Sequence, residues 1–237
     1  MKIYFGLILF FLVSKSSFSQ QISGEELLTC SIEYHDPQGL WDAFKSVFYV
    51  TMQSKDSSLR KSKIEVDIKN SFFKLTVQMN ENFTTSALNG EECTLFFNGS
   101  SSFSEEIKNE YSLTCDRAVM YRDYYQYLYG LPMKLNDNGT IIDPLIKSKK
   151  IGDILYWRLR VTYKPEVGED TWYFYFDQTT YALKRYQFFH DESKNDGEYI
   201  VLDQELLVNG IKIPKNRSWY YNNDDRYLGI DILSLNQ

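Results

Sequence analysis

The sequence predicts a mainly β protein with some α structure, in which about eleven antiparallel strands form a sheet curved over helices or over a ligand. Strand-length segments rich in Tyr, Phe and Trp follow one another from Asp153 to Leu233. A meander of further strands precedes them, and a stretch with helical spacing separates the two sets. Several of these strands are apolar on one side only, which is typical of a half-buried sheet.

The first twenty residues resemble a secretory signal peptide. Lys2 precedes an apolar run over 3–13, and small polar residues around Ser19 match the positions of a cleavage site. The run is too short for a membrane anchor, which needs about 20 apolar residues. We expect residues 1–20 to be removed and residues 21–237 to form a single exported domain, periplasmic or extracellular, with no membrane span.

The chain is acidic. Its 237 residues include 26 basic and 32 acidic side chains. Removal of Lys2 and Lys15 with the signal peptide would leave a formal charge of −8 on the exported form. Nucleic acids and anionic membrane surfaces are therefore disfavoured as partners of the broad surface.

The first half is expected to contain one helix and a β meander. Ser23 is a suitable N-cap, and Glu25 and Glu26 place carboxylates in the first turn, where the helix dipole favours them. Pro37 and Gly39 end this helix. Strands are then expected at 44–54, 62–69, 72–79 and 92–97.

The middle of the chain has helical spacing over 104–131, interrupted near 112–115, and Gly130 and Pro132 end it. We expect one or two helices lying across the sheet, and then an extended excursion over 131–152. The second half predicts strands at about 154–163, 171–177, 181–190, 198–208, 211–222 and 226–233.

Two joints in the second half have clear turn chemistry. Asn209-Gly210 separates two strand patterns and predicts a two-residue hairpin, because both positions favour positive φ. Residues 191–197 predict a longer polar hairpin tip. Alternation along the strands places two sets of apolar residues on common faces: Leu155, Trp157, Leu159, Val161 and Tyr163 on one strand, and Trp172, Phe174 and Phe176 on the next.

An exported chain with three cysteines, Cys30, Cys93 and Cys115, permits one disulfide. We favour Cys93 with Cys115, because one falls on a predicted strand and the other just after a helical stretch. Three buried thiols are an equally acceptable alternative.

The sequence contains no catalytic motif of the kinds we sought, which were G-x-S-x-G, H-E-x-x-H and phosphate-binding glycine loops. Acidic residues such as Glu166, Glu169 and Asp170 offer carboxylates for glycoside hydrolysis, but no local pattern selects a pair. The two histidines, His35 and His190, favour capping or surface roles over metal binding. We therefore predict no enzyme activity, no cofactor and no metal.

The segments YLYGLPMKL, DTWYFYFDQTTYAL, DESKNDGEYI and NGIKIPK, with the first helix SGEELLTCSIEYHDPQGLW, resemble a family of exported Bacteroidota proteins known only as a domain of unknown function. This resemblance covers roughly residues 25–233. It brings no established activity.

A wider resemblance is to the LolA-like periplasmic lipoprotein carriers and receptors. Phe176, Asp177 and Thr180 match a strand ending in Phe-Asp-x-x-Thr, and a hairpin into Gly-Ile-x-Ile-Pro is matched by Gly210, Ile211, Ile213 and Pro214. The resemblance implies an incomplete barrel, closed by the N-terminal helix and the central helices, around a cavity for acyl chains. In that case the apolar strand faces would line the cavity, with candidates Leu155, Trp157, Leu159, Trp172, Phe174, Phe176 and Trp219.

Two classes of function remain open at this point. The first is a non-enzymatic binding protein that holds a lipid, a lipoprotein acyl chain or another apolar ligand. The second is an envelope scaffold with a solid core, whose exposed aromatic residues bind a protein or glycan, with Tyr220, Tyr221 and Tyr227 as candidates. Hydrolysis by paired carboxylates is a weaker third alternative.

Overall fold

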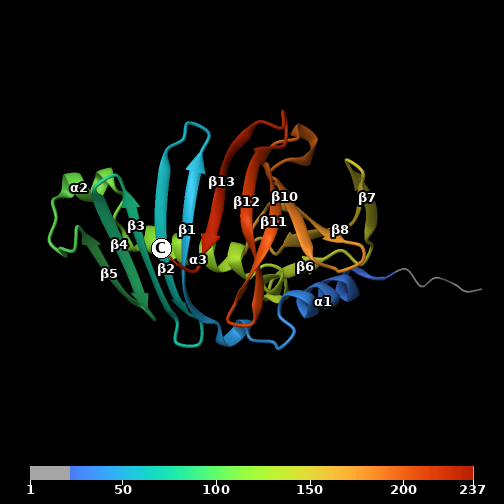
Figure 1. Cartoon of the computed structure of the whole chain (residues 1–237), viewed down its shortest axis with the longest axis horizontal. Coiled ribbons are helices and arrows are strands. Elements are labelled where there is room, and N and C mark those ends of the chain that lie inside the picture. The colour runs from blue at the N-terminus through green and yellow to red at the C-terminus, as the bar shows by residue number, and fades with distance from the viewer. Residues whose placement is uncertain (1–21, 237) are drawn as a thin grey trace, which may run out of the picture.

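The computed structural model describes residues 22–236, and within them all thirteen strands belong to one antiparallel sheet (Figure 1). The predicted signal peptide lies outside the described residues. The first half of the sheet contains β1 (Lys45–Ser54), β2 (Leu59–Asp67), β3 (Phe72–Met79), β4 (Asn82–Asn89) and β5 (Glu92–Phe97). The second half contains β8 (Ile154–Tyr163), β9 (Thr171–Asp177), β10 (Leu183–Phe189), β11 (Glu198–Val208), β12 (Ile211–Tyr221) and β13 (Tyr227–Ser234).

The two halves join where the first strand pairs with the last. β1 and β13 are antiparallel neighbours, so the sheet runs from β5 at one edge, through this pair, to β8 and β6 (Thr140–Ile142) at the other. β7 (Lys147–Ile151) pairs with β8 beside β6. Gly229 permits close approach at the junction, since a Cβ there would lie 2.6 Å from the Gln53 carbonyl oxygen. The edges do not pair, and the barrel stays open.

The N-terminal helix α1 (Gly24–His35) begins with a capping box. Ser23 accepts from the Glu26 amide, and the Glu26 carboxylate accepts from the Ser23 amide. The helix packs against β12. His35, for which the sequence favoured a capping or surface role, is instead fully buried, because its ring joins α1 to β10 and β12.

The central helices are α2 (Glu105–Glu110) and α3 (Cys115–Gly130), capped by Ser104 and Thr114. Figure 1 shows α3 passing behind the strands, across their direction. A disulfide joins Cys115, at the start of α3, to Cys93 on β5, with 6.0 Å between the Cα atoms. Short 3₁₀ turns complete the fold: η1 (Trp41–Ala43), η2 (Met133–Asn136) and η3 (Glu192–Lys194).

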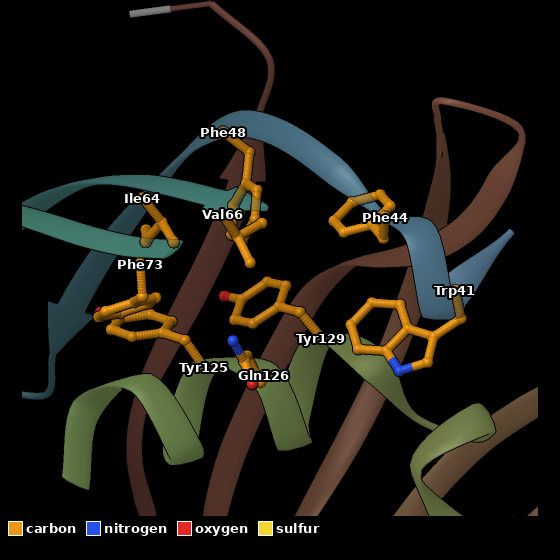
Figure 2. A pocket seen from close by; sticks show the side chains of 9 residues that line it. All are labelled: Trp41, Phe44, Phe48, Ile64, Val66, Phe73, Tyr125, Gln126 and Tyr129. Atoms are coloured by element: carbon orange, nitrogen blue, oxygen red, sulfur yellow. The ribbon is translucent and has the colours of Figure 1, made fainter. Parts of the chain in front are cut away.

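Beneath the first half of the sheet the core is solid. Tyr125 and Tyr129 point from α3 toward Phe73 and Phe48, as Figure 2 shows, with ring centroids 6.3 and 5.2 Å apart. The hollow among these side chains measures only about 10 Å³, roughly one water-sized sphere. At this place the side chains of α3 and of β1 to β3 therefore leave no room for a ligand.

The prediction of a mainly antiparallel open barrel with an N-terminal helix and central helices is confirmed. The interruption near 112–115 separates α2 from α3, and Asn209 and Gly210 both have positive φ in the predicted hairpin. The predicted number of strands, about eleven, was too low. The sequence analysis did not predict β4, and β6 and β7 lie in the segment 131–152 that was expected to be an extended excursion. β4 reads NFTTSALN and lacks large alternating apolar residues, while β7 reads KSKKI and lies exposed at an edge.

Candidate functional site

An open hollow of about 790 Å³ lies between α3 and the second half of the sheet, and we call it the large hollow. Its walls come from α3, from the region of η2, from the end of β8 and the loop that follows it, and from β9 to β12. They are formed by Asp123, Tyr124, Gln126, Tyr127, Leu128, Lys134, Asp137, Tyr163, Val167, Gly168, Asp170, Trp172, Phe188, His190, Glu198 and Trp219.

A second hollow of about 350 Å³ adjoins it and is called the small hollow. It is lined by β1, β13 and the shared wall: Met52, Ser54, Tyr124, Glu198, Trp219, Leu228, Gly229, Ile230 and Asp231. The two hollows have Tyr124, Glu198 and Trp219 in common. A ligand could therefore extend from one into the other.

The floor of the large hollow is a row of side chains set by strand register. Trp172 of β9 lies opposite Phe188 of β10, which in turn lies opposite Glu198 of β11. The rings of Trp172 and Phe188 are 4.9 Å apart, and Trp172 stacks on Phe174 at 6.0 Å. Directly opposite residues share a face, so the register places two aromatic rings side by side with the Glu198 side chain next to them.

The opposite wall comes from α3. Tyr127 contacts the Trp172 ring at 5.6 Å, and its hydroxyl makes a hydrogen bond with the Tyr163 hydroxyl. Burial raises the pKa of Tyr163 to about 12, so this pair stays uncharged at neutral pH. Tyr124 lines both hollows. Six aromatic side chains therefore line the large hollow, from the sheet on one side and from α3 on the other, and their apolar surface suits an apolar ligand.

Charged groups gather at the rim. His190 shares a hydrogen bond of 2.7 Å with the Asp170 carboxylate, and that bond raises the pKa of His190. Asp137 pairs with Lys134. An Asp–His pair can act as a general base, but the residues lining the large hollow include no Ser, Thr or Cys to serve as a nucleophile.

A hydrogen bond to the neighbouring strand fixes the orientation of the Trp219 side chain. Its indole N–H donates to the Asp231 carboxylate at 3.1 Å, and burial raises the pKa of Asp231. Arg217, directly opposite Asp231 across the strand pair, is only 1% exposed. Its guanidinium donates to the Leu128 carbonyl at 3.2 Å and lies over the Tyr129 ring, so it joins the last turn of α3 to the sheet.

The structure separates the seven predicted lining residues into four groups. Trp172 and Trp219 line the large hollow. Trp157 is partly buried against the core, whereas three others lie fully inside it: Leu159, Phe174 and Phe176. Leu155, with 51% of its surface exposed, is near the turn of the β7–β8 hairpin and outside both hollows.

Sequence reasoning missed much of the wall. The α3 residues Tyr124 and Tyr127 fall in the stretch 104–131 that was predicted to be helical, but they were not proposed to line a site, and Phe188 and Glu198 were not considered. Phe188 and Glu198 could have been found from the pairing of the predicted strands. The residue opposite Trp172 on the next strand, and the residue opposite that one, lie on the same face of the sheet. Among residues 22–236 no cluster of three or more metal-binding side chains occurs, and no helix there is long and apolar enough to cross a membrane.

Three solved structures show a likeness to this chain. A LolA superfamily protein from Nitrosomonas europaea is 12% identical, with a TM-score of 0.52, and the alignment covers 90% of this chain and 92% of that one. This likeness supports a LolA-like open barrel. A DUF1329 family protein from Desulfovibrio piger is 11% identical over 90% and 92% of the two chains, with a TM-score of 0.45.

A domain from Vibrio parahaemolyticus, described as an outer membrane lipoprotein-sorting protein, is 9% identical over 90% and 94% of the two chains, with a TM-score of 0.45. Scores of 0.45 are too low to carry an argument about the fold. No match is found among curated proteins. A family model described as a family of unknown function, DUF6503, matches residues 2–235. The chain therefore belongs to the DUF6503 family.

Proposed function

We propose that this protein is an exported, non-enzymatic binding protein that holds a lipid, a lipoprotein acyl chain or another apolar ligand in the large hollow. The observation that supports this most strongly is the aromatic space of about 790 Å³ between α3 and the sheet. Ligand sites of globular proteins commonly measure about 300 to 1,000 Å³ and are mainly apolar. The export rests on the sequence of residues 1–20.

The expected binding energy is sufficient for capture of a chain from water. Each buried CH₂ contributes about 0.8 kcal/mol, so ten methylenes contribute about 8 kcal/mol before the costs of ordering. The solid core around Phe48 and Phe73 leaves the space for a ligand under the second half of the sheet and at the junction of β1 with β13. The rigid aromatic walls lose little conformational freedom when a ligand enters, which favours affinity.

Calorimetric titration with 1-decanol tests this proposal, because a neutral ten-carbon alcohol probes the chain without a charged head. The Trp219→Ala variant should bind at least about tenfold more weakly, a loss of about 1.4 kcal/mol. Leu155→Ala, outside both hollows, is the matched control and should bind as the wild type does. Absence of decanol binding by the wild type, or equal affinity in Trp219→Ala, would contradict the proposal.

The scaffold alternative has one observation in its favour. Tyr199, Tyr220 and Tyr227 form an aromatic cluster, with ring centroids 5.0 and 5.4 Å apart, on the face of the sheet opposite Trp219. Tyr227 is partly exposed. If this cluster binds an envelope protein, Tyr227→Ala should abolish one dominant crosslinked partner in cells, whereas Trp219→Ala should retain it.

A further inference from the structure

The wall shared by the two hollows contains an unusual carboxylate. Glu198 lies at the start of β11 and is half buried. Phe188 lies directly opposite it on β10, and Trp219 lies two residues from its partner Tyr221 on β12. Tyr124 of α3 lines the same two hollows. The carboxylate is therefore set among aromatic side chains, at the point where the hollows meet.

Glu198 also differs from the other acidic groups of the large hollow in having no partner. Asp123 pairs with Arg122, Asp137 with Lys134 and Asp170 with His190. Within the described part of the chain, the Glu198 side chain makes neither a hydrogen bond nor a salt bridge. Burial without a partner raises the pKa of Glu198, and the charge of His190 opposes that rise. A ligand bearing positive charge would relieve this cost of desolvation.

The balance of charge around the hollow favours a cation over an anion. Four carboxyl groups line the large hollow, against one lysine and one histidine, and Asp231 lines the small hollow. A ligand carboxylate or phosphate near Glu198 would meet like charge. An ammonium group would meet a carboxylate close to the aromatic side chains of Trp219 and Tyr124, and aromatic rings attract cations.

We propose that the ligand is an amine-bearing amphiphile, with its ammonium group at Glu198 and its apolar chain along the Trp172–Phe188 floor of the large hollow. This inference rests on the proposed function and adds the chemical class of the head group. It predicts selection among amphiphiles of equal chain length: cationic first, neutral second, anionic last.

Three ten-carbon ligands with the same chain test the head group: decylammonium, 1-decanol and decanoate, titrated calorimetrically at pH 7.5. The wild type should bind decylammonium at least about tenfold more tightly than decanol, and decanoate more weakly than decanol. In Glu198→Gln, which keeps the size but removes the charge, the ratio of decylammonium to decanol affinities should fall to near one.

The matched control is Glu91→Gln, which removes one exposed negative charge at the turn between β4 and β5, near the far edge of the sheet. It should keep the preference of the wild type. Equal affinities for the three ligands in the wild type, or an undiminished preference in Glu198→Gln, would overturn the inference and leave the proposed function standing. Failure to bind any of the three would overturn both.

Discussion

His35 shows how one buried side chain fixes the N-terminal helix to the sheet. Its Nε2 accepts the Leu183 amide at 3.0 Å, so the proton of the neutral ring lies on Nδ1, which donates to the Lys212 carbonyl at 2.7 Å. Burial lowers the pKa of His35 below its ordinary value of 6.5. The fold therefore requires the neutral ring.

The unfolding free energy should consequently fall as the pH drops below 6.5. Above pH 6.5, His35 is neutral in both the folded and the unfolded state. Below pH 6.5, the unfolded chain takes up a proton and the folded chain does not, until the pH reaches the lowered pKa of His35 in the folded protein. The slope contributed by His35 should approach about 1.4 kcal/mol per pH unit. Urea unfolding at several pH values measures it.

His35→Gln should flatten that slope, and His190→Gln is the control. The exposed His190 has a raised pKa and contributes the opposite, smaller dependence. A slope in His35→Gln equal to that of the wild type would show that acid sensitivity has another source.

Arg217 makes a second prediction about a single side chain. Its replacement by Met would remove two hydrogen bonds, to the carbonyls of Pro214 and Leu128, and leave the buried Asp231 without its opposite charge. We expect a loss of about 3 to 5 kcal/mol in unfolding free energy, measured with urea. Arg226→Met, at an exposed site, should cost less than about 1 kcal/mol; equal losses would argue against a structural role for Arg217.

Among the elements, α3 is central because one of its faces completes the solid core and another forms the wall of the large hollow. Its start is tethered by the Cys93–Cys115 disulfide, and its end packs closely at Gly130, where a Cβ would lie 2.2 Å from the Trp41 ring. The helix is therefore held at both ends.

Removal of the tether should destabilise the protein by about 3 kcal/mol, because the disulfide closes a loop of 22 residues. In the Cys93→Ser/Cys115→Ser variant, amide hydrogen exchange should increase over 115–130. Cys30→Ser, which removes the free thiol, should leave both quantities unchanged. Unaltered exchange in the double variant would show that packing alone holds α3.

The helices and longer strands could be predicted because each has a local pattern. α1 has its capping box, and β8, β9, β11 and β12 have aromatic or apolar alternation bounded by turn residues. β6 has three residues and β7 is lysine-rich, so their pairing with β8 depends on tertiary contacts that local sequence does not record. The pairing of β1 with β13 also joins residues that are far apart in the sequence, so no local pattern predicts it.

At the scale of the whole molecule, one sheet has a filled half and a hollow half. The sequence predicted apolar strand faces in both cases, but Phe174 is core and Trp172, two residues away on the same face, lines the large hollow. Phe174 lies between Leu159 and Tyr186 on the neighbouring strands and is fully buried, whereas Trp172 lies beside the open space and meets Tyr127 of α3. Periodicity identifies a face of a strand, and tertiary packing decides which part of that face a ligand can reach.

The four tryptophans allow a direct test of that division. Trp172 and Trp219 line the large hollow, whereas Trp41 and Trp157 do not. A long-chain alcohol carrying bromine on its chain quenches the fluorescence of a tryptophan that it contacts. With this ligand, Trp41→Phe/Trp157→Phe should be strongly quenched and Trp172→Phe/Trp219→Phe should not. Quenching that persists in the second variant, or is absent from the first, would contradict a chain-binding site between α3 and the sheet.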